Sequence, residues 1–94
     1  MAVTVHIPGP LQKLTNNQEA VEVEVADAAS IEDVINGLEN AHPGIKNRLV
    51  ENGEIRGYIN IFVNDEDIKF IKGMGTHVKE GDSVNIVPSI AGGA

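Results

Sequence analysis

One amphipathic helix, set among short alternating segments, constrains the fold of this 94-residue chain more than any other feature. Four apolar residues recur at the spacing that gathers side chains on one helix face, namely Ile31, Val34, Ile35 and Leu38. Ser30 precedes them as a predicted N-cap, and Asp33 can complete a capping box. Pro43-Gly44 ends the helix, while Gly37 within it costs about 1 kcal/mol relative to alanine, for no reason visible in the sequence. One such helix can cover one face of a sheet.

Residues on both sides of the helix alternate between apolar and polar types, which is the pattern of half-buried strands. The alternation predicts strands at 3–7, 21–25, 58–63 and 84–87, and a short strand at 68–70 after an acidic turn at 64–67. A polar loop joins the first two strands as a hairpin. The element order β-β-α-β-β-β and the right-handed crossover rule leave few topologies. We predict an α+β fold of the β-grasp (ubiquitin-like) type, a mixed sheet of four to five strands covered on one face by one helix, with its first and last strands adjacent at the centre.

The composition narrows the possible classes of function. A net charge of −7 argues against nucleic acid and anionic membranes as partners, because both demand a basic face. The chain has no cysteine, which excludes disulfides, thiolate catalysis and thiolate metal sites. The N-terminus lacks the features of a signal peptide, and no apolar run reaches membrane-spanning length. We therefore expect one soluble cytoplasmic domain over residues 1–94.

No pattern in the sequence indicates catalytic residues or metal ligands. The three histidines, His6, His42 and His77, are scattered and lack the spacing of a local metal motif. The carboxylates Asp65, Glu66 and Asp67 fall in a predicted turn, where acidic side chains stay solvated. The stretch Gly73-Met74-Gly75 lacks the following helix of a phosphate-binding loop. We predict that the chain is not an enzyme and binds no metal or cofactor.

The C-terminal stretch offers a different kind of site. Pro88 ends the last strand because it has no backbone donor, and residues 89–94 are expected to form a flexible tail ending in Ala91-Gly92-Gly93-Ala94. A diglycine has no Cβ, so it can extend through a narrow channel of another protein towards a nucleotide, and its carboxyl is unhindered. The alternative interpretation is a frayed terminus without function.

Three stretches carry a resemblance to a known family: Tyr58 to Asp67, Gly81 to Pro88, and Ala91-Gly92-Gly93. With the order of elements, they make the whole chain resemble the ubiquitin-like sulfur carriers of the MoaD/ThiS family. Residues 42–49 are similar in particular to the carrier of thiocarboxylate-dependent cysteine synthesis. In that family a ubiquitin-activating-enzyme-like adenylyltransferase uses ATP to adenylate the terminal glycine, which a sulfur donor converts to a thiocarboxylate. The resemblance implies that Gly93 is this glycine, and that Ala91 and Gly92 thread into the partner.

The chain continues one residue past the end of the family's mature carriers. The resemblance implies that Ala94 is first removed by a zinc metalloprotease of the deubiquitinase-like type. A sulfur-acceptor synthase would then use the thiocarboxylate for cysteine, or homocysteine and methionine, biosynthesis, with thiamine thiazole, molybdopterin and tRNA left open as other acceptors. Three rivals stand beside this interpretation: a ubiquitin-like modifier that acylates lysines through Gly93, the small sulfur-donating subunit of molybdopterin synthase, and a plain binding module with an inert tail.

Strand parity predicts where a partner docks on the body of the protein. Val84 and Ile86 share one face of the last strand, so Val87 points to the opposite face. Three residues of the third strand form its inward set, namely Ile59, Ile61 and Val63. We predict that the activating enzyme docks on an apolar patch on the outer face, made up of Tyr58, Phe62, Val87 and Ile90.

Overall fold

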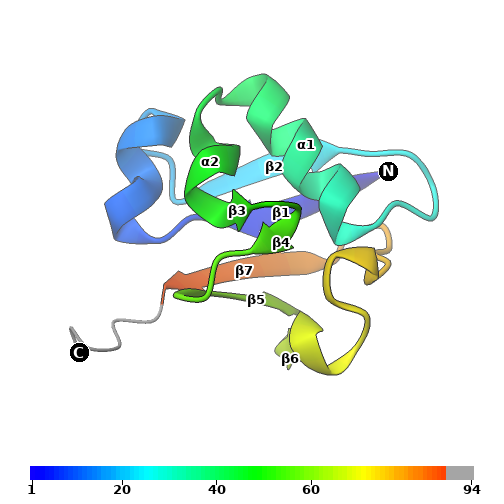
Figure 1. The fold of residues 1–94 in the computed structure, drawn as a ribbon. Helices are drawn as coiled ribbons and strands as arrows, with labels where there is room; N and C mark the ends of the chain where they lie inside the picture. The colour runs from blue at the N-terminus through cyan, green and yellow to red at the C-terminus, as the bar shows by residue number, and fades with distance from the viewer. Residues whose placement is uncertain (89–94) are drawn as a thin grey trace.

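The computed structural model describes residues 1–88, which form a five-stranded sheet with the α-helices on one of its faces (Figure 1). The strands of this sheet are β1 (Ala2–His6), β2 (Ala20–Glu24), β5 (Ile59–Val63), β6 (Glu66–Asp67) and β7 (Ser83–Pro88). The α-helices are α1 (Ile31–Ala41) and α2 (Ile45–Leu49), and a separate hairpin pairs β3 (Val50–Glu51) with β4 (Glu54–Ile55). Short 3-10 helices lie in three connections: η1 (Gly9–Thr15), η2 (Ile68–Phe70) and η3 (Gly73–Gly75).

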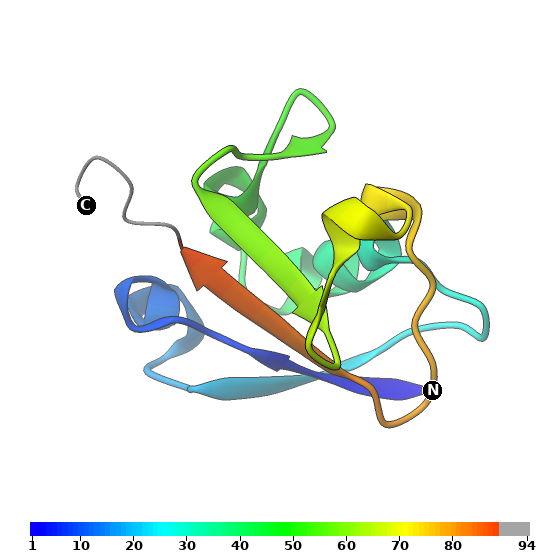
Figure 2. The ribbon, with the colours of Figure 1, turned by 90° about the horizontal axis from the view of Figure 1, so that it is seen from below.

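The strand order of the sheet is β2-β1-β7-β5-β6, so the first and last strands lie side by side at the centre, as Figure 2 shows from below. β1 and β7 run parallel, and the other neighbouring strands are antiparallel. This arrangement confirms the predicted α+β β-grasp fold, including the mixed sheet and the central position of β7.

Aliphatic side chains from the sheet and the helices build one core. The predicted inward residues of β5 and β7 are all buried: Ile59, Ile61, Val63, Val84 and Ile86. The predicted stripe of α1 is buried in the same core, and the short helix α2 closes the core with Ile45 and Leu49, neither of which has any exposed surface. Each fully buried aliphatic side chain contributes about 1.5–3 kcal/mol to stability.

Helix α1 begins as predicted, and its close packing on β2 explains the glycine at position 37. Ser30 is the N-cap, and its hydroxyl and the Asp33 carboxylate form a reciprocal capping box. At Gly37 the helix lies so close to β2 that an added Cβ would stand 2.7 Å from Cγ1 of Val23. Glycine therefore lets α1 approach the sheet closely enough to bury its stripe.

Replacing this glycine tests the close approach. We expect Gly37→Ala to lower the free energy of unfolding by about 1 kcal/mol, because overpacking against the stiff Val23 side chain outweighs the gain in helix propensity. Asn40→Ala, at an exposed position of the same helix, is the matched control and should not destabilise the protein. Urea denaturation of both variants measures the difference, and a Gly37→Ala variant more stable than the original would contradict the packing argument.

A carboxylate holds the connection between the two helices. The Glu39 carboxylate accepts hydrogen bonds from the backbone N–H groups of Gly44, at 3.0 Å, and Lys46, at 2.8 Å. These bonds favour the charged form and hold the pKa of Glu39 below its ordinary value. Their contribution to stability is therefore present above the ordinary pKa and lost as the pH falls through the lowered one. The same contacts fix where α2 begins.

One predicted strand is wrong. Residues 68–70 form the 3-10 helix η2, and the returning strand β6 consists of Glu66 and Asp67, which the sequence had placed in a turn. The Asp67 side chain accepts the N–H of Lys69 at 2.8 Å, which caps η2 and ends the strand. In η2 the side chain of Ile68 is buried in the core, whereas Phe70 is exposed. In a strand these two side chains would lie on the same face.

Three smaller differences concern the connections. The segment expected to be a polar loop contains η1, whose Thr15 is buried and bonds to the carbonyls of Gln12 and Gln18. The third predicted strand begins at Ile59 rather than at Tyr58, which lies in the preceding turn. The β3–β4 hairpin was not predicted, although the pair Asn52-Gly53, with φ of 55° and 81°, is a recognisable hairpin turn.

Candidate functional site

The central strand β7 fixes the position from which the C-terminal residues leave the body of the protein. β7 pairs with β1 on one side and with β5 on the other. The pairing with β5 runs from Ile59↔Pro88 to Val63↔Val84. Its Val84 and Ile86 are buried in the core. A strand held by two neighbours and by the core is a rigid support, so Pro88 occupies a defined place at the edge of the fold.

A small cavity of about 160 Å³ lies beside this exit point. Its lining residues come from four separate parts of the chain: Pro10, Leu11, Arg48, Tyr58, Ile59 and Pro88. The walls are apolar and the Arg48 side chain adds a positive charge, which suits an apolar or acidic group of a partner. Sequence reasoning missed Pro10, Leu11 and Arg48 as site residues, because the sequence holds no signal that joins positions so far apart.

The outer face of β5 and β7 carries two of the residues predicted to form a docking patch, Phe62 and Val87. Val87 is 44% exposed and Phe62 is half-buried, while the alternate residues of both strands are buried, so the predicted parity of both strands is confirmed. In the ladder Asn60 pairs with Val87 and Phe62 pairs with Asn85, which makes Phe62 and Val87 diagonal neighbours. The structure therefore brings Phe62 and Val87 together.

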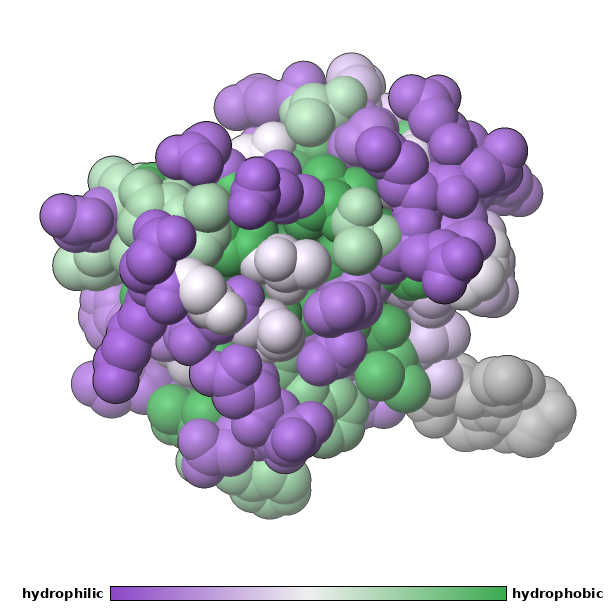
Figure 3. All heavy atoms as spheres, turned by 180° about the vertical axis from the view of Figure 1, so that it is seen from behind, coloured by the Kyte–Doolittle hydropathy of each residue, from purple (hydrophilic) through white to green (hydrophobic). Residues whose placement is uncertain are grey.

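Tyr58 does not join this pair. Tyr58 lines the cavity at the end of β7 instead of continuing the outer face of β5. Ile90 lies outside the described residues, as do the predicted tail positions Ala91, Gly92, Gly93 and Ala94. On the face of the molecule drawn in Figure 3, hydrophobic residues surface in small separate groups among hydrophilic ones.

Other candidate sites are not assembled in the part of the chain that the structure describes. Within residues 1–88, no three histidine, aspartate or glutamate side chains are grouped as a metal site would require. His77 Nδ1 lies 2.9 Å from the carbonyl oxygen of Ala28, and His42 caps the C-terminus of α1. Gly73-Met74-Gly75 forms η3. No helix over residues 1–88 has the length and apolar character needed to cross a membrane.

Comparisons with known proteins match nearly the whole chain. The sequence pattern of the ThiS family matches residues 5–93. The sulfur carrier protein CysO of Mycobacterium tuberculosis is 41% identical over 96 aligned residues, which cover 99% of this chain and 100% of that protein. The small archaeal modifier protein 3 of Haloferax volcanii is 34% identical over 76 residues, which cover 81% of this chain and 83% of that protein.

A solved structure agrees with these matches. In the crystal structure of the Amycolatopsis orientalis BexX/CysO complex, one chain is 41% identical to this chain. The two superpose with a TM-score of 0.90, over 97% of this chain and 99% of the other.

Proposed function

Because this chain belongs to the ThiS family, as its resemblance to that family led us to expect, we propose that it carries sulfur as a thiocarboxylate on Gly93. One observation carries the proposal: the family pattern matches residues 5–93 and so ends on the second glycine of the tail. The match to the sulfur carrier protein CysO over 99% of the chain supports the same conclusion. In this role the chain is a protein cosubstrate on which other enzymes act.

The chemistry takes place at the end of the tail. In the first step, a carboxylate oxygen of Gly93 attacks the α-phosphorus of ATP within an activating enzyme, and pyrophosphate leaves. In the second step, a sulfide-level sulfur nucleophile attacks the acyl carbon and displaces AMP, which leaves a thiocarboxylate. An unhindered glycine suits both attacks. From Pro88, five residues reach Gly93, and an extended chain of that length spans about 17 Å, enough to enter a partner's active site.

One step precedes this chemistry and two follow it. Before adenylation, a protease removes Ala94, so that Gly93 becomes the terminal residue. The thiocarboxylate sulfur then attacks an activated carbon of an amino-acid substrate held by a synthase of cysteine or of homocysteine and methionine, and displaces the leaving group of that substrate. Hydrolysis of the acyl bond to Gly93 releases the product and restores the Gly93 carboxylate. Ala91 and Gly92 occupy the channel of each partner, while the outer face of β5 and β7 holds the body of the protein against it.

Transfer of radiolabelled sulfide tests the proposed function. The chain ending at Gly93, mixed with its activating enzyme, ATP and labelled sulfide, should incorporate label in an ATP-dependent way. Denatured protein should release the label on mild hydrolysis, as expected for an acyl-bound sulfur. If the activating enzyme is active and consumes ATP but no label precipitates with the protein in acid, the proposal is wrong.

A second candidate function is protein modification. The small archaeal modifier protein 3 matches 81% of the chain, and the same activated Gly93 could acylate a lysine instead of accepting sulfur. Lysine-linked adducts in extracts of the native host, absent when Gly93 is deleted, would favour this function.

The docking patch gives a separate prediction. We expect Val87→Glu and Phe62→Glu to weaken binding to the activating enzyme by about tenfold or more, because each places a charge in a desolvated interface. Phe70→Glu, at the 88% exposed end of η2, is the matched control and should bind normally. Calorimetric titration measures the affinities, and melting curves confirm that the variants fold. If both variants fold and bind normally, the docking surface lies elsewhere on the protein.

A further inference from the structure

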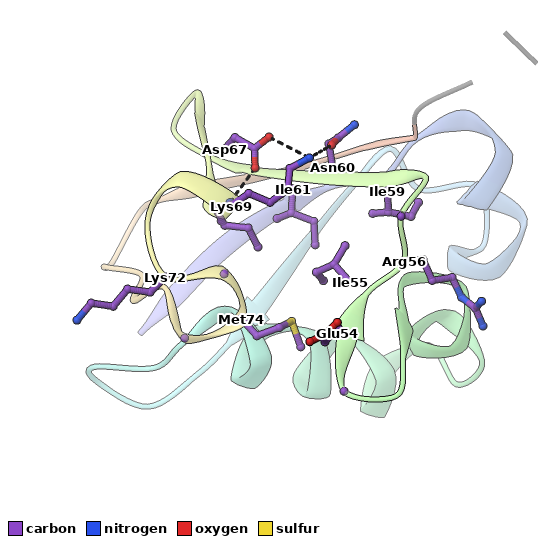
Figure 4. A pocket seen from close by; sticks show the side chains of 15 residues that line it. Glu54, Ile55, Arg56, Ile59, Asn60, Ile61, Asp67, Lys69, Lys72 and Met74 are labelled. Atoms are coloured by element: carbon purple, nitrogen blue, oxygen red, sulfur yellow. Dashed lines mark hydrogen bonds and ion pairs between the residues drawn. The ribbon is translucent and has the colours of Figure 1, made fainter. Parts of the chain in front are cut away.

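A second cavity, of about 540 Å³, lies between the β3–β4 hairpin and the η2–η3 segment, with β5 along one side (Figure 4). Ile55 and Met74, both half-buried, point into it from opposite sides. The side chain of Ile61 faces it from β5. The sulfur-carrier chemistry of the tail makes no use of this cavity.

The open edge of β5 borders this cavity. β6 pairs only with Phe62 and Val63, because the chain turns into η2 after Asp67. Within the described residues, the segment 59–61 therefore has a strand neighbour on its β7 side alone.

The ladder shows which backbone groups face that open edge. The N–H of Asn64 donates to the carbonyl of Ser83 at 3.0 Å. Ser83 comes directly before Val84, the first residue of β7 that pairs with β5. Since the bonding direction alternates along an antiparallel strand, Phe62 and Asn60 bond towards β7, and Ile61 faces away from it. The N–H of Ile59, on the same open side, donates to the carbonyl of Arg56 at 2.9 Å. The β5–β6 hairpin uses the C=O of Ile61, because Phe62↔Asp67 is a non-hydrogen-bonded pair flanked by that carbonyl. The N–H of Ile61 and the C=O of Ile59 are thus left for an incoming strand.

Five charged residues line the cavity, three basic and two acidic: Arg56, Lys69, Lys72, Glu54 and Asp67. Their sum of +1 is opposite in sign to the net charge of −7 of the whole chain. The ammonium of Lys69 lies on the outer face, where it donates to the Asn60 side chain at 3.0 Å and stands 3.9 Å from the carboxylate of Asp67. Lys72 forms no ion pair with another residue of the described part of the chain.

From this geometry we propose that the open edge of β5 binds a short extended segment of another protein, in which apolar and acidic residues alternate. The segment adds to the sheet as a strand, accepts the N–H of Ile61 and donates to the C=O of Ile59. Its side chains alternate between two faces, so one set packs on Ile55 and Met74 in the cavity. The other set reaches the outer face, where a carboxylate pairs with Lys69. An acidic residue at the end of the segment pairs with Lys72, which projects from the η2–η3 segment (Figure 4). This surface goes beyond the proposed function and does not depend on the tail.

A fluorescein-labelled peptide, Asp-Val-Glu-Val-Asp-Val, tests this proposal with the full-length protein. We expect saturable binding by fluorescence anisotropy, and roughly tenfold weaker binding to the double variant Lys69→Glu, Lys72→Glu. The double variant Lys13→Glu, Lys79→Glu changes the net charge equally at exposed sites elsewhere and should bind the peptide normally. The basic peptide Lys-Val-Lys-Val-Lys-Val should bind neither protein.

Amide hydrogen exchange separates strand addition from a purely electrostatic contact. Saturating peptide should slow exchange of the Ile61 amide by roughly tenfold or more, since that N–H gains a partner, and should leave the β7-bonded amides of Asn60 and Phe62 little changed. Three results would overturn the proposal: no saturable binding, binding without protection of Ile61, or equal losses in the two double variants. Protection of Ile61 that rises with protein concentration in the absence of peptide would overturn it as well, because a second copy would then occupy the edge.

Discussion

Removal of Ala94 should raise ATP–pyrophosphate exchange, catalysed by the cognate activating enzyme, by roughly 100-fold or more. An extra residue shifts the terminal carboxylate by about 3.5 Å, and displacement of a reacting group by even 1 Å can cost about 100-fold in rate. The comparison needs only two chains, one that ends at Gly93 and the full-length chain that ends at Ala94.

Substitution at the new terminus provides the control for this comparison. A chain that ends at position 93 with Gly93→Ala has the same length as the active form and differs by one methyl group. We expect it to bind the activating enzyme but to be adenylated more slowly than the glycine form, because the Cβ crowds the carboxyl group. Equal exchange by the Gly93 and Ala94 chains would show that Ala94 need not be removed.

The variant Ile61→Ala should lower the free energy of unfolding by about 2–5 kcal/mol and the melting temperature by roughly 10–30 °C. Ile61 is 1% exposed and lies opposite Ile86 of β7, so the truncation leaves a cavity in the core, on the inner face of these two strands. Differential scanning calorimetry measures the loss directly.

Two milder changes serve as controls for this core substitution. Val87→Ala removes a side chain that is 44% exposed in the strand next to β5, and it should cost much less than Ile61→Ala. Deletion of residues 91–94 should shift stability by under about 0.5 kcal/mol, because the fold is predicted not to depend on the tail. A large fall in melting temperature on tail deletion would contradict that independence.

Much of the fold could be predicted because local patterns and long-range pairing agree. The spacing of the apolar residues in α1 and the Ser30 cap are both local, and both are as expected. The alternation in β5 and β7 also gave the correct inward faces, which placed Val87 and Phe62 on the outer face. Where local chemistry competed with alternation, as at the Asp67 cap of η2, the sequence pattern pointed to a strand that does not form.

The candidate site was predictable only in its linear part. The diglycine tail and its strand are one continuous stretch, so the sequence alone could propose them as the site, and the tail stays a prediction. The cavity beside Pro88 is built from Arg48, Tyr58 and the start of η1, which only the three-dimensional fold brings together. The reason for Gly37 was hidden in the same way, because it depends on the distance between α1 and Val23 of β2.

The most direct test of sulfur transport is mass spectrometry of the C-terminal peptide from protein purified from its native host. Our account predicts a peptide that ends at Gly93, with Ala94 absent and one carboxyl oxygen replaced by sulfur in at least part of the sample. A peptide that still ends at Ala94 and carries no sulfur, or a Gly93 found only in linkage to lysines, would contradict it.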